Sequence, residues 1–228
     1  MIPLRDENPT ILTPIVTVTL IVLNCLVYLY QLSLGPAAES FILSYAAVPA
    51  EWFRPGTVVG APEVPNTVTV FTSMFLHGSV MHLGGNMLYL WIFGNNIEDV
   101  MGHARFILFY LLCGVAAVFG HAVTAPESTV PMIGASGAIS GVLGAYLLLF
   151  PHARVHVLIL LGIFVRIVPI PAVYVLGFWI VMQVLNGAFS WGGLGGGVAW
   201  FAHVGGFAAG LVLIKVFQRR PVGPALRW

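Results

Sequence analysis

Ser136 is the first candidate for chemistry, because it places a hydroxyl between small residues at the start of an apolar helix. It lies in Gly134-Ala135-Ser136-Gly137, and the apolar run continues to Phe150. The first N–H groups of a helix have no intrahelical partner, so they can stabilise a developing oxyanion. A tight helix-packing face that carries an ordinary serine would explain the same motif, and other parts of the chain must decide between the two.

His203 is the second candidate, because a serine hydroxyl is a weak nucleophile that needs an adjacent base, commonly a histidine. Gly206 and Gly210 follow it at a spacing that leaves one helix face bare, as the glycines after Ser136 also do. Bare faces let two helices approach closely in lipid. We therefore predict that these two helices touch and that His203 acts as the general base for Ser136.

His82 and Asn86 are candidates for stabilising the oxyanion. They are four residues apart, so they share one face of a helix, and both lie within about two turns of its end. Their side chains can donate to an oxyanion together with the backbone N–H of Ser136. The alternative is that they only hydrogen-bond to neighbouring helices. His77, just before this helix, is expected to order the loop and not to take part in chemistry.

No carboxylate is placed to complete a catalytic triad with His203. The acidic residues all fall in loops or at the ends of apolar runs: Asp6, Glu7, Glu39, Glu51, Glu63, Glu98, Asp99 and Glu127. The sequence therefore predicts a Ser136–His203 dyad, in which packing orients the imidazole and no carboxylate does so, unlike the usual three-member arrangement.

The elements that must position these residues are membrane-spanning helices. Of the 228 residues, 59% are hydrophobic and 7% are charged, and the mean hydropathy is +0.96. A soluble domain has about 25% charged residues, so the composition indicates an integral membrane protein. Cys25 and Cys113 lie in apolar runs, where we expect free thiols. Two cysteines so far apart offer no metal-binding spacing.

Six apolar runs are predicted to cross the bilayer, whose hydrocarbon core needs about 20 residues of helix. They cover residues 11–32, 79–95, 106–123, 136–150, 172–189 and 199–217. The apolar run at 156–165 is too short to cross and is followed by an arginine and two prolines, so we assign it to a connecting segment. The prediction is a single all-α membrane domain over residues 1–228.

The distribution of positive charge supports six spans. If the chain crosses six times, eight of its nine basic residues fall on one side of the membrane, and Arg54 alone falls on the other. The positive-inside rule makes the first side cytoplasmic, with both the N- and C-termini on it. The fourth and sixth spans then both enter from outside. Ser136 and His203 therefore lie within about one turn of the outer boundary, and this matched depth favours the dyad.

Three separated motifs occur in order along the chain: Thr72-x-x-Phe75-x-His77-x4-His82-x3-Asn86, then Gly134-Ala135-Ser136-Gly137, then His203-x-x-Gly206-x3-Gly210. Together they resemble the rhomboid family of intramembrane serine proteases, and the resemblance covers nearly the whole chain. It implies a six-transmembrane-helix bundle with Ser136 as nucleophile and His203 as general base. It also implies that His82, Asn86 and the Ser136 N–H bind the oxyanion, and that the substrate is a transmembrane segment cleaved near the outer face.

The resemblance further implies a lateral gate for the substrate, formed by the fifth helix and the link after it. In this chain the gate would comprise Trp179, Gln183 and residues 190–198. Many members of the family carry a Trp-Arg pair in the first outer loop, shortly before the second span. This sequence has Val68-Thr69 there, so the resemblance does not predict how its first loop docks on the core.

Two other functions fit parts of the sequence. A catalytically silent relative would bind membrane proteins without cutting them, but such a protein is expected to lack Ser136 or His203. A transporter could use His77, His82 and His203 to bind ions or relay protons, but it leaves the serine motif unexplained. We expect transmembrane protein substrates and the lipid bilayer as partners, with no nucleic acid, no cofactor and no metal. A bacterial cytoplasmic membrane is the simplest location, and the oligomeric state is left open.

Overall fold

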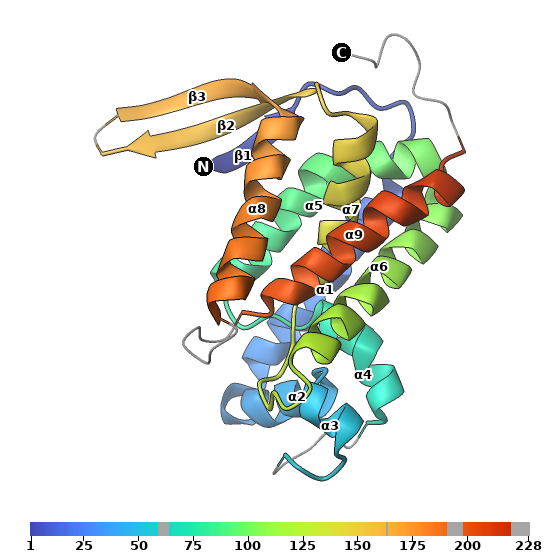
Figure 1. Cartoon of the computed structure of the whole chain (residues 1–228), viewed down its shortest axis with the longest axis vertical. Coiled ribbons are helices and arrows are strands. Elements are labelled where there is room, and N and C mark those ends of the chain that lie inside the picture. The colour runs from blue at the N-terminus through green and yellow to red at the C-terminus, as the bar shows by residue number, and fades with distance from the viewer. Residues whose placement is uncertain (59–63, 163, 191–197, 220–228) are drawn as a thin grey trace.

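A helix bundle with a small β-sheet at one end makes up the fold (Figure 1). A computed structural model describes residues 1–58, 64–162, 164–190 and 198–219. The long helices are α1 (Ile15–Ser33), α5 (Val80–Met101), α6 (His103–Thr124), α7 (Ser136–Leu149), α8 (Ala172–Ser190) and α9 (Trp200–Phe217). Shorter helices lie between α1 and α5: α2 (Ala38–Tyr45), α3 (Pro49–Phe53) and α4 (Asn66–Thr72), with 3-10 turns at Gly35–Ala37 and Ser73–Phe75. The strands are β1 (Ile2–Asp6), β2 (Arg154–Leu161) and β3 (Phe164–Pro171).

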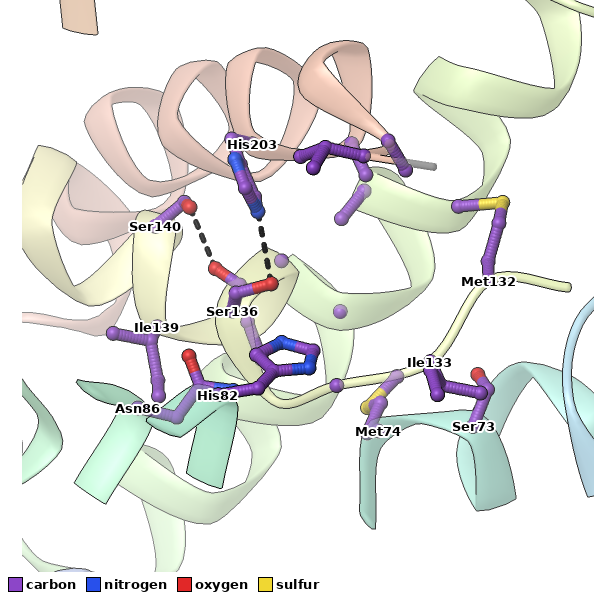
Figure 2. A pocket seen from close by; sticks show the side chains of 18 of the residues that line it. Ser73, Met74, His82, Asn86, Met132, Ile133, Ser136, Ile139, Ser140 and His203 are labelled. Carbon is purple, nitrogen blue, oxygen red and sulfur yellow. Dashed lines mark hydrogen bonds between the residues drawn. The ribbon is translucent and has the colours of Figure 1, made fainter. Parts of the chain in front are cut away.

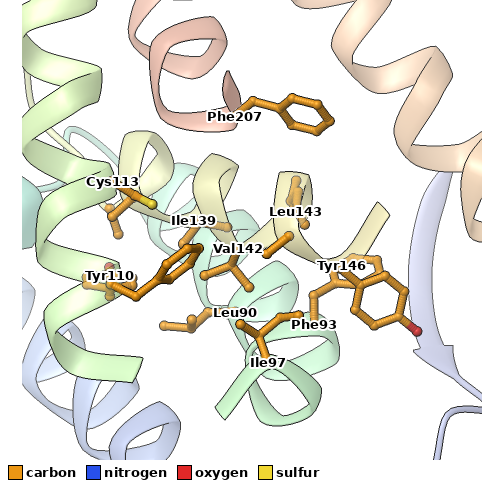
Figure 3. Packing of buried hydrophobic residues seen from close by; sticks show 14 of the residues in the cluster. Leu90, Phe93, Ile97, Tyr110, Cys113, Ile139, Val142, Leu143, Tyr146 and Phe207 are labelled. Atoms are coloured by element: carbon orange, nitrogen blue, oxygen red, sulfur yellow. The ribbon is translucent and has the colours of Figure 1, made fainter. Parts of the chain in front are cut away.

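α7 is the central helix of the bundle, and it is buried from Gly137 to Tyr146. It packs against α5, α6 and α9 (Figure 3). The shared core is apolar: Leu90, Phe93 and Ile97 from α5, Tyr110 and Cys113 from α6, Ile139, Val142, Leu143 and Tyr146 from α7, and Phe207 from α9. Ser136 is the first residue of α7, so the buried helix fixes the position of the candidate nucleophile.

α7 and α9 approach closely because glycines lie between them. A Cβ on Gly206 would collide with the carbonyl oxygen of Gly137, and a Cβ on Gly210 would collide with that of Gly141. Small residues allow such close contact between membrane helices, where packing drives association. The predicted contact between the two glycine faces is confirmed. It holds together the two helices that carry the candidate dyad.

Four helices in the described part of the chain are long and apolar enough to cross a membrane: α1, α6, α8 and α9. α7 is apolar but has only 14 residues, and α5 contains Asn86, Glu98 and Asp99. Each of the six predicted spans coincides with a helix, whereas length and composition identify four of these helices as crossing. The chain is an integral multi-pass membrane protein.

Residues 154–171 form a β-hairpin. β2 pairs antiparallel with β3 on one side and with β1 on the other, in the order β1-β2-β3. The prediction that this segment does not span the membrane as a helix is confirmed. The expectation of an all-α fold is wrong here, because the segment forms strands. The β-branched residues Val155, Val157 and Ile159 alternate along β2. This two-residue period favours a strand.

Glu98 and Asp99, at the end of α5, bind the start of α1. Glu98 is fully buried and accepts hydrogen bonds from the N–H groups of Val16 and Thr17 at 2.9 and 2.8 Å. The Thr17 hydroxyl donates to the same carboxylate at 2.7 Å. Asp99 accepts from the N–H of Leu12 at 2.9 Å. The first N–H groups of a helix need such acceptors, so these carboxylates fix α1 beside α5.

The connection between α1 and α5 docks on the loop that leads to Ser136. Ala47 and Met132 exchange two backbone hydrogen bonds, at 3.2 and 2.8 Å. The N–H of Ala50 donates to the carbonyl of Ser128 at 2.9 Å. The first loop therefore packs on the core through its backbone, although it lacks the Trp-Arg pair.

Candidate active site

The loop before α7 turns at Gly134 and so places Ser136 at the helix start. Gly134 has a φ of +121°, a conformation that glycine adopts far more readily than other residues. Its N–H donates to the carbonyl of Ser73 at 2.9 Å. A Cβ at Gly134 would also come within 2.7 Å of the His82 Nε2. The glycine thus permits both the turn and the close approach of His82 to the start of α7, where N–H groups lack intrahelical partners.

The side chains of Ser136 and His203 are in hydrogen-bonding contact (Figure 2). Ser136 Oγ lies 2.8 Å from His203 Nε2, within the range of about 2.6–3.2 Å that a general base requires. The Ser140 hydroxyl donates to the backbone carbonyl of Ser136 at 2.6 Å within the first turn of α7. Helices that the sequence placed at one depth therefore bring a hydroxyl and an imidazole together.

Gln183 on α8 orients the imidazole of His203. Its Oε1 lies 2.8 Å from His203 Nδ1, and its Nε2 donates to the carbonyl of Trp179 at 3.2 Å. The amide nitrogen is thus used within α8, which leaves Oε1 to accept from Nδ1–H. With its proton on Nδ1, the imidazole presents a lone pair on Nε2 to the Ser136 hydroxyl. The expectation that packing alone orients His203 is wrong, because a neutral amide binds its second nitrogen.

Trp179 lies one helical turn before Gln183 and packs beside the same imidazole. The ring centroids of Trp179 and His203 are 5.8 Å apart. The family resemblance predicted both α8 residues as part of a gate, and in the structure both lie against the candidate base. Residues 191–197 of the predicted 190–198 link lie outside the described residues.

His82 and Asn86 on α5 line the pocket beside Ser136 (Figure 2). Asn86 Nδ2 lies 2.9 Å from His77 Nε2. Burial, and repulsion from the His82 imidazole when that ring is protonated, lower the pKa of His77 to about 4. A neutral imidazole can accept the hydrogen bond from the amide of Asn86. His77 was predicted to order the loop, and in the structure its side chain positions Asn86.

Gln31 is a supporting residue that sequence reasoning missed. Its side chain bonds both backbone groups of His77, donating to the carbonyl and accepting from the N–H, each at 3.1 Å. The side chain is buried in α1. A polar residue inside a predicted span was the available signal, because such residues usually have a specific partner.

Two adjoining cavities surround these residues. The first has a volume of about 430 Å³ and is lined by Ser136, His203, His82 and Asn86. The second has a volume of about 710 Å³ and shares His82 with the first. Its polar lining residues are His121, Thr124, Glu127, Ser128 and Ser190. A cavity with these polar side chains next to Ser136 and His203 can supply water to them. Within the described ranges, no three His, Cys, Asp or Glu residues are arranged to hold a metal ion.

The chain matches a known family over the region that carries Ser136 and His203. The family model of the Rhomboid domain matches residues 65–220. The chain belongs to the rhomboid family. This rhomboid chain is 31% identical over 181 residues to Rhomboid protein 1, mitochondrial, of Saccharomyces cerevisiae. The match covers 72% of this chain and 48% of the relative. It is 32% identical over 157 residues to Rhomboid protease GluP of Bacillus subtilis, with 69% and 29% covered. It is 37% identical over 90 residues to the Presenilin-associated rhomboid-like protein, mitochondrial, of Homo sapiens, with 39% and 24% covered.

The rhomboid chain spans less than half the length of each of these relatives. Its matched region contains the candidate catalytic, oxyanion and positioning residues His77, His82, Asn86, Ser136, Gln183 and His203. β1 and α1, with the supporting Gln31, precede the matched region.

Proposed function

We propose that this rhomboid protein is a serine endopeptidase that cleaves transmembrane segments of other membrane proteins. The observation that carries the proposal is the 2.8 Å between Ser136 Oγ and His203 Nε2 in the wall of a cavity within the helix bundle. A base at this distance can take the hydroxyl proton and so make the serine a nucleophile. The similarity to a relative that is named a rhomboid protease adds support.

In the first half-reaction, Ser136 Oγ attacks the carbonyl carbon of the scissile peptide bond while His203 Nε2 removes the proton of the Ser136 hydroxyl. The Ser136 backbone N–H and the side chains of His82 and Asn86 stabilise the oxyanion. The C–N bond then breaks, and His203 transfers its proton to the leaving amine. The product is an acyl-enzyme on Ser136 and a fragment with a new amino terminus.

In the second half-reaction, water hydrolyses the acyl-enzyme. His203 removes a proton from the water as its oxygen attacks the acyl carbon, and Ser136 Oγ leaves with a proton from His203. The second cavity supports this step, because it adjoins the first at His82, carries polar side chains and can bring water to the site.

The proposal includes six membrane crossings with both termini in the cytoplasm, so that the site lies near the outer face, most simply of a bacterial cytoplasmic membrane. β1 pairs with β2, and the N–H of Arg219, after α9, donates to the carbonyl of Val100 at 3.1 Å. Both described ends of the chain therefore lie at one end of the bundle, as an even number of crossings requires. α7 runs toward β2, so its first residue, Ser136, lies at the end of the helix that is farther from β2.

Covalent labelling and product mapping test the function. A fluorophosphonate probe should label the purified protein in liposomes at Ser136. A panel of model transmembrane substrates should be cut, and mass spectrometry should place each cut within or near the membrane segment. Absence of both labelling and cleavage would refute the protease and leave the silent relative. Proton or metal flux without labelling would favour the transporter instead.

Asn86→Ala should reduce kcat by about 100-fold, the effect of losing one oxyanion donor. The loss should be smaller than that from removing the nucleophile, because the Ser136 N–H and His82 still donate. Asn186→Ala on α8 is a matched control that should leave kcat unchanged. The rate is measured with one model substrate in liposomes. An unchanged kcat in Asn86→Ala would show that this amide only bonds His77.

Gln183→Met should lower kcat by about 100-fold with little change in KM, because the imidazole loses the acceptor that fixes its orientation. Gln183→Glu retains an oxygen acceptor and should recover most of the activity. Thermal unfolding of both variants checks that the bundle stays folded. A purely structural role predicts that activity follows stability in both, and equal activity of the two variants would exclude orientation by Oε1.

A further inference from the structure

The β2–β3 hairpin leaves the bundle sideways at the N-terminal end of α8 (Figure 1). Each strand has eight residues, so at about 3.3 Å per residue the hairpin reaches about 26 Å. Its base is held by hydrogen bonds from the N–H of Ala172 to the carbonyl of Ala153 at 2.9 Å and from Val173 to Pro151 at 2.8 Å. β3 runs into α8 without a linker. The hairpin therefore has a defined position relative to a helix long enough to cross a membrane.

The base of the hairpin is buried, whereas its outer half is an exposed apolar surface. Val155 and Val157 are completely buried. Beyond them, the exposed fractions are 57% for Leu160, 62% for Val165 and 57% for Ile167. Leu160 and Val165 pair directly across the two strands. Exposed apolar area is unfavourable in water by about 25 cal/mol per Å², and a two-stranded hairpin is only marginally stable there. The outer half of the hairpin thus needs an apolar environment.

The hairpin is also cationic. Between Pro151 and Pro171 the charged residues are Arg154 and Arg166, and this stretch of sequence contains no acidic residue. Both arginine side chains are exposed. Guanidinium groups bind phosphate through two parallel hydrogen bonds. An apolar surface that carries arginines is typical of segments that lie at the interface of anionic membranes.

α8, the helix that directly follows the hairpin, also has exposed apolar side chains. Phe178 and Val181 on α8 are each 53% exposed, as expected for side chains that contact lipid tails. Because the hairpin leaves sideways at the N-terminal end of this helix, its outer half projects away from the bundle, over the area that a bilayer around α8 would occupy. An anionic membrane surface fits both the exposed apolar side chains and the arginines.

We propose that the outer half of the β2–β3 hairpin, with Leu160, Val165, Arg166 and Ile167, lies in the headgroup layer of the leaflet opposite the Ser136 end and binds anionic lipids. The apolar side chains enter the boundary between headgroups and acyl chains, and Arg166 binds lipid phosphates. This inference depends on membrane insertion of the helices and is independent of the proteolytic function.

A fluorophore at Val165 tests the location. In a Cys25→Ala background the other native cysteine, Cys113, is completely buried, so Val165→Cys can be labelled selectively with the environment-sensitive dye NBD. In liposomes of phosphatidylcholine and phosphatidylglycerol, its emission should shift to the blue and be quenched by lipids with a shallow nitroxide. Glu39→Cys, an exposed position in α2, is the control and should show water-like emission without quenching.

The lipid class is tested by placing the nitroxide on one lipid at a time. Labelled phosphatidylglycerol should quench the dye at position 165 more strongly than labelled phosphatidylcholine. Arg166→Gln should weaken this preference by about fivefold, the effect of one basic residue at an anionic surface. Equal quenching by both lipids would overturn the anionic preference. Water-like emission at position 165, or a blue shift without lipid quenching, would overturn the membrane contact, and the latter would indicate a protein partner.

Discussion

Ser136→Ala should reduce cleavage of a model transmembrane substrate by about 10⁶-fold, to a rate near the detection limit. The Ser136 hydroxyl supplies the oxygen that attacks the carbonyl. In the described part of the chain, it is the oxygen that hydrogen-bonds to His203 Nε2, at 2.8 Å. Fluorophosphonate labelling should disappear as well. Ser44→Ala is the control, because the Ser44 hydroxyl donates only to the carbonyl of Ser40 in its own helix.

His203→Ala should cause a loss of similar size, and the double variant should be no slower than either single one. A nucleophile and its base act as a unit, so removing either removes the contribution of both. Cleavage rates of the four proteins, each checked for folding by thermal unfolding in detergent, give the comparison. If His203→Ala kept near wild-type activity, the assignment of a Ser136–His203 pair would be wrong.

Gly210→Ala should destabilise the protein by about 3 kcal/mol, the upper end of the cost of overpacking a core. The added Cβ meets the carbonyl oxygen of Gly141, and a backbone atom cannot rotate away as a side chain can. α7 and α9 must therefore separate. Since a displacement of about 1 Å can cost 10²-fold in rate, kcat should fall by about 100-fold in the protein that still folds.

Gly177→Ala on α8 is the matched control for this substitution. It is also a glycine in a long helix, but a Cβ there has no atom within 4 Å, so stability should stay unchanged or rise slightly. Thermal unfolding in detergent and the rate of fluorophosphonate labelling are measured for both variants. Equal behaviour of Gly210→Ala and Gly177→Ala would show that α7 and α9 do not depend on the glycine contact.

The existence and order of the long helices could be predicted, because each is an apolar run bounded by polar or glycine-rich segments. The boundaries were less accurate. The second predicted span, 79–95, stops six residues short of the end of α5 at Met101. The polar residues there favour a loop by sequence, but tertiary contacts satisfy them: Asn96 Nδ2 donates to the carbonyl of Asn8 at 2.8 Å, and Glu98 accepts from the start of α1.

The approach of Ser136 to His203 could also be predicted. Both residues lie near the start of a helix, and the distribution of positive charge predicts that the two helices cross the membrane in the same direction. Glycine spacing then indicates which faces meet. All three signals can be taken from the sequence alone, so no knowledge of tertiary contacts is needed to bring the two side chains to one depth.

Only the tertiary structure decided which other polar groups serve the pair. Gln183 binds His203 from α8, and Gln31 reaches His77 from α1. The hairpin of residues 154–171 likewise depends on pairing with β1 at the far end of the sequence. Outside the glycine faces of α7 and α9, a helix in lipid can be apolar around its whole circumference, so its sequence does not specify its rotation. Hydrogen bonds between helices depend on that rotation, and packing of the complete bundle sets it.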